Sequence, residues 1–119
     1  MNNRKLGTMG EEAAIACLVE RGYKIVARNF RVGRMGEIDI IARDGDYLCF
    51  IEVKARSSDI YGTPAQAVSP LKQETIRKLS QVYMQKYRIY DTPVRFDVAE
   101  LFMTRDGIVK DIQIIQNAF

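Results

Sequence analysis

The sequence contains no histidine and no tryptophan. Without histidine the chain cannot build a Ser-His-Asp triad, a histidine-dependent nuclease site or a His-ligated zinc site. It also lacks the glycine-rich phosphate-binding loop of nucleotide hydrolases and the Gly-x-Gly-x-x-Gly turn of dinucleotide-binding proteins. Any catalysis must therefore rely on carboxylates, lysine and a metal ion.

Cysteine is scarce, and long apolar runs are absent. Cys17 lies on the apolar face of a predicted helix and Cys49 among strand residues, so both are predicted to be reduced core cysteines. No run reaches the length of a membrane span, and the first residues lack the apolar core of a signal peptide. The sequence predicts a cytoplasmic protein with no membrane partner.

The composition is that of an ordinary globular protein. The chain has 119 residues, of which 47% are hydrophobic and 28% charged, with a formal net charge of +3. This length fits one domain over residues 1–119 with a core of its own. The small positive charge is compatible with a polyanionic partner.

Residues 36–54 concentrate the acidic side chains. Two β-rich runs, 38–42 and 47–53, flank an Asp-Gly-Asp sequence, which is a strong hairpin signal. Because side chains alternate along a strand, Glu37 and Asp39 are predicted to share one face, with Ile38 and Ile40 on the other. On the second run, Glu52 and Lys54 share a face in the same way.

Two registers of this hairpin are open. A Gly45–Asp46 loop would place Asp39 directly across from Glu52, whereas an Asp44–Gly45 loop would place Glu37 there. Either way, opposed carboxylates cost up to about 1 kcal/mol. A divalent cation held by Asp39 and Glu52 would remove that cost, and Lys54 would lie beside it. The alternative is an exposed, solvated strand face.

Glu11 has two interpretations. A helix is predicted from about Met9 to Arg21, and Gly22 is a typical helix stop. Thr8, followed three residues later by Glu11, matches a capping box. Glu11 therefore either caps this helix or contributes an acidic group at the edge of the metal site.

Basic residues occur near the acidic hairpin. Arg28, Arg31 and Arg34 lie in and after a predicted strand over residues 23–32, where they could contact DNA phosphates or form a solvated edge that prevents aggregation. Lys72 lies in the first turn of a helix predicted over residues 69–87, starting with Ser69 and Pro70. The helix dipole disfavours a cation there, so Lys72 is either a phosphate contact or an ordinary surface lysine.

The other segments complete an α/β pattern. Residues 55–68 are predicted to be a polar loop, and strands are predicted over 94–103 and 108–115 around a turn at 105–107. In the second helix, Ile76, Leu79, Tyr83 and Tyr87 form a stripe that favours a buried face over base stacking. The order α-β-β-β-α-β-β predicts a mixed sheet flanked by helices.

Four motifs spread over nearly the whole chain resemble a known family. Residues 10–14, 36–42, 50–54 and 67–72 read GEEAA, GEIDIIA, FIEVK and AVSPLK, and together they are similar to the YraN-type family of bacterial proteins. That family resembles archaeal Holliday junction resolvases and the wider PD-(D/E)xK nuclease superfamily. Ile38 stands where the superfamily signature has proline, as is common in the resolvase-like branches.

The resemblance implies a restriction-endonuclease-like fold with Mg²⁺ or Mn²⁺ as cofactor. In the superfamily an Asp and a Glu bind the metal, a Lys assists the attacking water and a Glu from the first helix joins the site. Those roles fall on Asp39, Glu52, Lys54 and Glu11, and the carbonyl of Val53 is an expected further ligand. The implied partner is DNA, including branched DNA. Junction resolvases act as two-fold pairs, but the sequence leaves a homodimer open.

We therefore expect a metal-dependent endonuclease that hydrolyses phosphodiester bonds in DNA, with Lys72, Arg28, Arg31 and Arg34 on phosphates. Two other classes of function remain open. One is a nucleic-acid-binding module without catalysis, and the other is a partner-binding scaffold whose acidic face is merely solvated. Metal-dependent cleavage separates the first reading from the others, and salt-sensitive DNA binding separates the second from the third.

Overall fold

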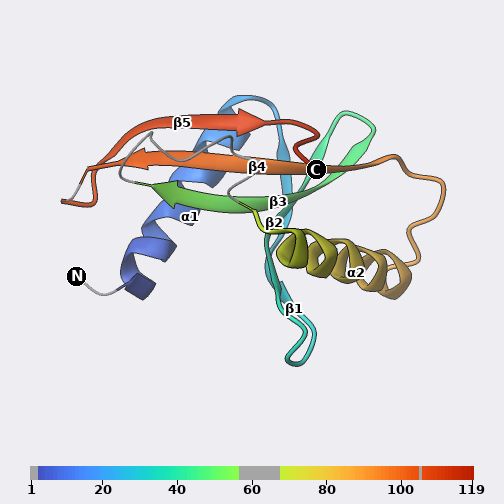
Figure 1. Cartoon of the computed structure of the whole chain (residues 1–119). Coiled ribbons are helices and arrows are strands. Elements are labelled where there is room, and N and C mark those ends of the chain that lie inside the picture. Colours follow the sequence, from blue (N-terminus) through green and yellow to red (C-terminus); the bar gives the residue numbers. More distant parts are fainter. Residues whose placement is uncertain (1–2, 57–67, 105) are drawn as a thin grey trace.

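The computed structural model describes residues 3–56, 68–104 and 106–119, with side chains from residue 9 onward (Figure 1). The elements are α1 (Asn3–Glu20), β1 (Lys24–Arg31), β2 (Glu37–Asp44), β3 (Tyr47–Arg56), α2 (Pro70–Lys86), β4 (Val94–Met103) and β5 (Val109–Ile115). Their order confirms the predicted α/β fold. Most of the predicted 55–68 loop and Arg105 of the predicted turn lie outside the described residues; Ala55 and Arg56 belong to β3.

The five strands form one mixed sheet in the order β1-β2-β3-β4-β5. The pairs β1–β2, β2–β3 and β4–β5 are antiparallel, whereas β3 and β4 are parallel. Parallel neighbours need a crossover connection, and α2 lies in it. Figure 1 shows α1 and α2 on opposite sides of the sheet, with the β1–β2 hairpin extending past its lower end.

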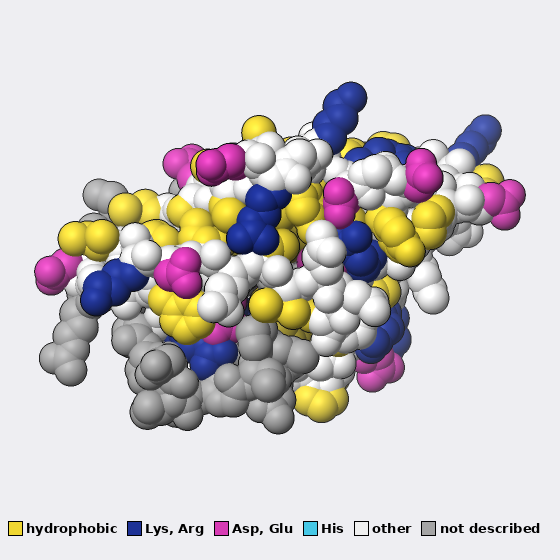
Figure 2. Space-filling view, turned by 90° about the horizontal axis from the view of Figure 1, so that it is seen from above, with side chains coloured by type: hydrophobic (Ala, Val, Ile, Leu, Met, Phe, Trp, Pro, Cys, Tyr) yellow, Lys and Arg dark blue, Asp and Glu magenta, His cyan; other side chains and the backbone are white. Residues whose placement is uncertain are grey.

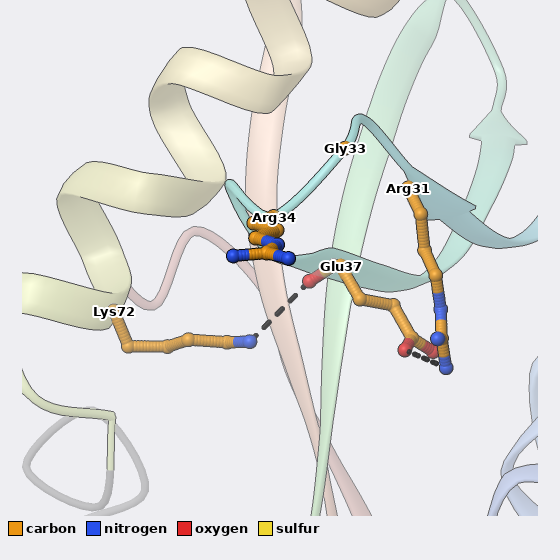
Figure 3. Close-up of a pocket in the computed structure, with 6 residues that line it drawn as sticks. Arg31, Gly33, Arg34, Glu37 and Lys72 are labelled. Atoms are coloured by element: carbon orange, nitrogen blue, oxygen red, sulfur yellow. Dashed lines mark hydrogen bonds and ion pairs between the residues drawn. The ribbon is translucent and has the colours of Figure 1, made fainter.

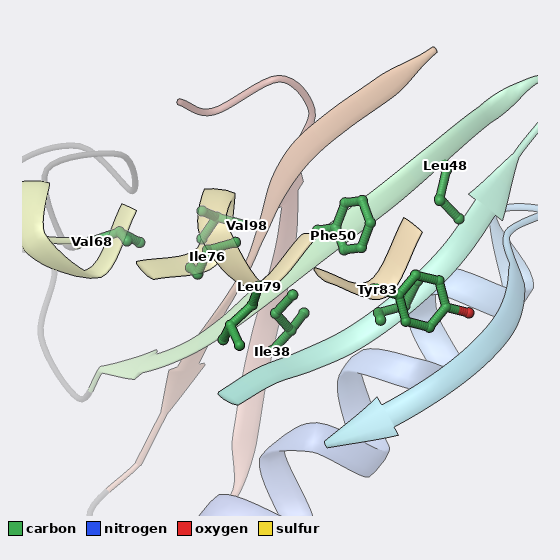
Figure 4. Packing of buried hydrophobic residues seen from close by; sticks show 9 residues of the cluster. Ile38, Leu48, Phe50, Val68, Ile76, Leu79, Tyr83 and Val98 are labelled. Atoms are coloured by element: carbon green, nitrogen blue, oxygen red, sulfur yellow. The ribbon is translucent and has the colours of Figure 1, made fainter. Parts of the chain in front are cut away.

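Each helix covers its own hydrophobic cluster. Against α2, the fully buried Phe50 packs with Ile76, Leu79 and Tyr83 (Figure 4). Against α1, Ala14 and Leu18 join a cluster of strand residues that comprises Ile40, Ala42, Cys49, Ile51 and Ala99. Both cysteines are free, as predicted, but only Cys49 is a buried core residue, because Cys17 is half-buried. Burial of apolar area on both faces stabilises the sheet between the helices.

The β2–β3 hairpin adopts the first of the two predicted registers. Asp44 pairs with Tyr47, which leaves Gly45 and Asp46 as the loop. Gly45 has a φ of +59°, which glycine adopts without a steric penalty. The pairs continue to Ile40 opposite Ile51, where the ladder ends, and Asp39 and Glu52 are the next residues on the two strands.

One prediction about this hairpin is wrong. Ile38 and Ile40 do not share a face, because Ile38 packs in the cluster under α2 and Ile40 in the cluster under α1. On the neighbouring strand, Ala27 and Phe30 both pack toward α2 although they are three residues apart. Regular alternation is therefore interrupted at Asn29 and Asp39, which the β1–β2 register sets opposite each other.

The capping box predicted for α1 is also wrong. The helix begins at Asn3, so Thr8 is a residue of its interior rather than its N-cap. The predicted stop is correct: Gly22 has a φ of +95°, and the N–H of Tyr23 donates to the carbonyl of Leu18 at 2.9 Å. With the bond from Gly22 N–H to Val19 O at 3.0 Å, this is a Schellman motif.

The second helix starts as predicted. The Ser69 side chain accepts a hydrogen bond from the N–H of Lys72 at 3.2 Å, and Pro70 occupies the first position. Three members of the predicted stripe are buried, namely Ile76, Leu79 and Tyr83. Tyr87, the C-cap, is 54% exposed. The buried face is thus one turn shorter than the sequence pattern indicates.

A polar network joins the C-terminal residues to the sheet on the α1 side. The Tyr23 hydroxyl donates to Asp97 Oδ2 at 3.1 Å and accepts from Arg95 Nη2 at 2.8 Å. Burial raises the pKa of Tyr23 to about 12, so it remains a donor. The N–H of Asn117 donates to Asp97 Oδ1 at 2.9 Å, which ties the last residues to β4.

Candidate active site

Three carboxylates meet where α1, β1 and β2 come together. Glu11 of α1 and Glu37 and Asp39 of β2 each offer an oxygen within 4.8 Å of the others. We call these three residues and Glu52 of β3 the carboxylate cluster. All three of the predicted acidic site residues, Glu11, Asp39 and Glu52, therefore lie in one part of the molecule.

Asp39 is held by the backbone of β3. Its Oδ2 accepts a hydrogen bond from the N–H of Val53 at 2.8 Å, next to the last paired residues of the β2–β3 ladder. Burial, together with a hydrogen-bonding contact to Glu52 and its charge, raises the pKa of Asp39 to about 8. Asp39 therefore keeps its proton at neutral pH when no cation neutralises the site.

Glu52 is buried with one oxygen unsatisfied. The residue is 5% exposed, and its Oε2 has no hydrogen-bond partner among the described residues. The Lys72 ammonium provides a positive charge nearby, with its Nζ 3.6 Å from that oxygen. A buried carboxylate oxygen without a partner costs on the order of 1–3 kcal/mol or more. The arrangement fits a cation that would complete the coordination of Glu52.

Glu11 is positioned by Asn29. The Asn29 amide nitrogen lies 3.1 Å from Glu11 Oε2, 3.3 Å from Glu11 Oε1 and 2.5 Å from Glu37 Oε1, so its N–H groups donate to both carboxylates. Asn29 has a φ of +51°, a left-handed conformation that asparagine tolerates better than most residues. Burial raises the pKa of Glu11, as do Asp39 and Glu37, against the lowering effect of the Asn29 hydrogen bond.

Lys54 lies two residues beyond Glu52 on β3 and is half-buried. In the parallel register it stands beside Glu100 of β4, which is fully buried and forms an ion pair with Arg56. Side chains alternate between the two faces of a strand. Lys54 and Glu52 are two residues apart, so they are expected on the same face of β3. The membership of Lys54 in the candidate site, its role and that of the Val53 carbonyl stay predictions.

The predicted basic residues separate into two groups. Arg31, Arg34 and Lys72 line a pocket of about 300 Å³ together with Gly33, Gly36 and Glu37 (Figure 3). Arg28 is exposed on β1 and does not line this pocket, but its charge acts on Glu11. Figure 2 shows another face, seen from the β5 side, where isolated basic side chains alternate with acidic and apolar ones.

The sequence did not point to two contacts of this site. Asn29 carried one usable signal, because an asparagine between strand residues is a candidate for a left-handed break in the strand. The sequence contained no signal for the contact of Lys72 with Glu52, since this contact depends on how α2 packs against β3. The anion that compensates Lys72 in the first helical turn is a residue of the same chain.

The oxygens of the cluster suit a hard divalent cation. Carboxylate and carbonyl oxygens favour Mg²⁺, Mn²⁺ or Ca²⁺, and Asp39, Glu52 and Glu11 supply such donors from three different elements. Nitrogen and sulfur ligands contribute nothing to this site, as there is no histidine and the described cysteines lie in or beside the core. The residues present therefore fit the implied metal.

The architecture is that of an α/β domain: a mixed five-stranded sheet between two helices, with acidic residues on the hairpin that precedes the crossover. A family model described as "Uncharacterised protein family UPF0102" matches residues 10–101. The chain belongs to this family, which is the YraN-type family that its motifs indicated.

Curated relatives support the same assignment. A UPF0102 protein of Acetivibrio thermocellus is 54% identical over 99% of this chain and 93% of its own length. A UPF0102 protein of Caldicellulosiruptor saccharolyticus is 41% identical over the full length of both chains. One from Syntrophus aciditrophicus is 47% identical over 98% of this chain and 90% of its own. Among the described residues, no helix is long and apolar enough to cross a membrane.

Proposed function

We propose that this protein is a Mg²⁺- or Mn²⁺-dependent endonuclease that hydrolyses phosphodiester bonds in DNA. One observation carries the proposal: the half-buried Asp39 and the buried Glu52 lie side by side, with the pKa of Asp39 raised to about 8 and Glu52 Oε2 without a hydrogen-bond partner among the described residues. Such a pair is unfavourable as a structural feature, because adjacent carboxylates that are withdrawn from water repel each other. We therefore attribute the position of these two carboxylates to function and not to stability.

Asp39 and Glu52 would hold the cation, with the Val53 carbonyl and Glu11 as further oxygen donors. A bound divalent cation polarises a phosphoryl oxygen and lowers the pKa of a coordinated water. The Val53 N–H fixes one oxygen of Asp39 at 2.8 Å, so the protein presets the orientation of this ligand. Asn29 does the same for Glu11 through its amide.

Two lysines supply positive charge on either side of Glu52. Lys54, on the same strand face, is placed to orient the attacking water and to stabilise the charge that develops on the phosphate. Lys72, whose Nζ lies 3.6 Å from Glu52 Oε2, becomes available to a phosphate oxygen when another cation neutralises Glu52. In this scheme both lysines act electrostatically.

The test is cleavage of labelled linear, flapped, gapped and four-way DNA in Mg²⁺, Mn²⁺ or EDTA. We expect cleavage that needs the metal and is lost in Asp39→Asn and Glu52→Gln. Asp46→Asn is the matched control, because Asp46 is an exposed aspartate in the loop of the same hairpin. Salt-sensitive DNA binding without cleavage in either metal would instead support the non-catalytic nucleic-acid-binding function.

A further inference from the structure

The pocket beside the carboxylate cluster has walls from two elements. Arg31, Arg34 and the glycines at positions 33 and 36 belong to the end of β1 and the β1–β2 turn, and Lys72 belongs to the first turn of α2. In Figure 3 the Lys72 side chain extends from the helix toward the turn, and its Nζ donates to the carbonyl of Glu37 at 3.3 Å. The pocket thus lies between α2 and the β1–β2 hairpin, and the Lys72 side chain spans it.

One positive charge in this pocket is not balanced. Of the three cationic side chains, Arg31 pairs with Glu37 at 2.7 Å and Lys72 lies 3.6 Å from Glu52 just outside the pocket, which leaves Arg34. Among the residues that the structure describes, Arg34 has no ion-pair partner. An unpaired guanidinium beside a second basic side chain attracts an anion with planar or tetrahedral oxygens, because its N–H groups form a fixed fork.

The backbone of the turn leaves room for such an anion. Gly33 has a φ of +52°, and a Cβ added there would meet nothing within 4 Å. Gly36 has a φ of +142°, which essentially only glycine adopts. An added Cβ at Gly36 would lie 2.8 Å from Thr75 Cγ2, so this glycine lets the turn approach α2, and the open side of the turn is at Gly33, where the oxygens of a ligand could approach the main chain.

The pocket and the carboxylate cluster share a wall. Glu37 belongs to both, and Lys72 contacts both Glu37 and Glu52. A ligand that filled the two sites together would need an anionic group in the pocket and another beside the cluster. A polynucleotide strand has this pattern, with one negative phosphate per nucleotide.

We infer that the pocket formed by Arg31, Arg34 and Lys72 is a phosphate subsite that takes the backbone phosphate next to the one at the carboxylate cluster. The inference rests on the proposed function for the identity of the ligand. It adds a requirement that the function alone does not make: cleavage should depend on one particular neighbouring phosphate. The alternative is that Arg31, Arg34 and Lys72 are ordinary solvated side chains, on the edge hairpin and on α2, that bind no particular anion.

The direct test uses inorganic phosphate and the metal-free protein. Phosphate is titrated into ¹⁵N-labelled protein at constant ionic strength, with chloride as the reference anion, and the amide shifts of Gly33, Arg34 and Gly36 are followed. We expect saturable shifts at these three residues, and about tenfold weaker binding in Arg34→Ala. Arg28→Ala is the matched control, since it removes an exposed arginine from the same hairpin but not from the pocket.

Some outcomes would overturn the inference. These are shifts that match those of chloride, shifts located elsewhere, or an equal loss of affinity in Arg28→Ala and Arg34→Ala. The folded state of each variant is checked in the same spectra, so a loss of binding cannot be confused with unfolding. Because this experiment uses neither metal nor DNA, its result does not depend on whether the protein cleaves DNA.

The second arm identifies the source of the phosphate. Single-stranded DNA in which single phosphates are replaced by neutral methylphosphonates is cleaved in Mn²⁺. We expect one replacement adjacent to the cut to slow cleavage about tenfold in the wild type and to have little effect in Arg34→Ala. Equal sensitivity in both proteins would overturn the inference while leaving the nuclease in place. Phosphate binding in the pocket without any cleavage would leave the subsite in place and remove the proposed function.

Discussion

The N–H of Val53 donates to Asp39 Oδ2 at 2.8 Å, beside the last pair of the β2–β3 ladder. A side chain thus takes the place that a strand carbonyl would otherwise occupy. Asp39 has no ion-pair partner within the described part of the chain, so its carboxylate is fixed by the backbone and not by a basic residue. This separates it from Asp97, a fully buried aspartate whose Oδ1 lies 2.9 Å from the Arg95 guanidinium.

Replacing Asp39 by asparagine should not weaken the fold. In EDTA, Asp39→Asn removes the repulsion from Glu52 and keeps an oxygen that can accept from Val53, so stability should stay equal or rise by about 1 kcal/mol. The rise in melting temperature caused by Mn²⁺ should be lost, because stabilisation by a ligand requires its site. Thermal melts in EDTA and Mn²⁺ measure both effects.

The control is Asp97→Asn, which should destabilise the fold and keep the Mn²⁺-induced rise in melting temperature. If Asp39→Asn were destabilised in EDTA and kept that rise, the assignment of Asp39 to a metal site would be refuted.

The stability of the metal-free protein should fall as pH rises from about 4 to about 8. An ordinary aspartate titrates near 4, whereas the pKa of Asp39 in the folded protein is raised to about 8. Between these values the folded state keeps a proton that the unfolded chain releases, so each step up in pH favours unfolding. Urea melts across this range in EDTA should show the slope, and Asp39→Asn should lack most of it. The same slope in both proteins would assign the effect to other groups.

Asn29 should control the balance of charge around Glu11. Asn29→Asp replaces a donor by a further carboxylate beside Glu11 and Glu37, so it should lower stability in EDTA by on the order of 1 kcal/mol and enlarge the Mn²⁺-induced rise in melting temperature. Asn29→Gly keeps the left-handed backbone and removes the amide, which separates the hydrogen bonds from the strand geometry. If Asn29→Asp and Asn29→Gly behaved alike in EDTA and in Mn²⁺, the added charge would have no role.

Gly36 should tolerate no side chain. An added Cβ would lie 2.8 Å from Thr75 Cγ2, and the φ of +142° is strained for alanine. Gly36→Ala should therefore destabilise the protein by about 1–3 kcal/mol and loosen the packing of the hairpin against α2. Gly33→Ala, with open space around the new Cβ, should cost less. Denaturant melts give the two values, and a larger loss for Gly33→Ala would contradict the close approach.

Lys72 should contribute to DNA binding through its charge. Lys72→Ala should weaken binding to all sequences and reduce the slope of log K against log salt by about one. Lys78→Ala is the matched control: Lys78 is on the same helix, but its Nζ pairs with Glu74 at 3.2 Å. Fluorescence anisotropy in a salt series measures the slopes. An unchanged slope for Lys72→Ala would mean that Lys72 serves only to compensate Glu52.

The sequence was informative where a signal is local. Gly22, Ser69 and Pro70 marked helix ends correctly, because helix caps depend on a few adjacent residues. The sequence left the register of the β2–β3 hairpin open, since Asp44-Gly45-Asp46 allows two different two-residue loops. It failed at Ile38 and Ile40, because a strict period of two assumes a regular strand.

The residues of the candidate site divide in the same way, into those that local sequence patterns could group and those that they could not. Asp39, Glu52 and Lys54 could be grouped in advance because a hairpin joins them. Glu11 could be connected to them only by the family resemblance, and the competing capping box was wrong because α1 continues back to Asn3. Which residues contact Lys72 depends on how α2 packs against the sheet, and local sequence patterns do not encode such a contact.

The carboxylate cluster takes its members from α1, β2 and β3, and its neighbours from β1 and α2. No single fragment of the chain contains it, and β3 pairs on one side with β2 and on the other with β4, which is synthesised later. A nascent or partly unfolded chain therefore carries the acidic residues without their geometry. In the proposed nuclease this would act as a safeguard, because activity would appear only when the whole domain has folded and would vanish when it begins to open.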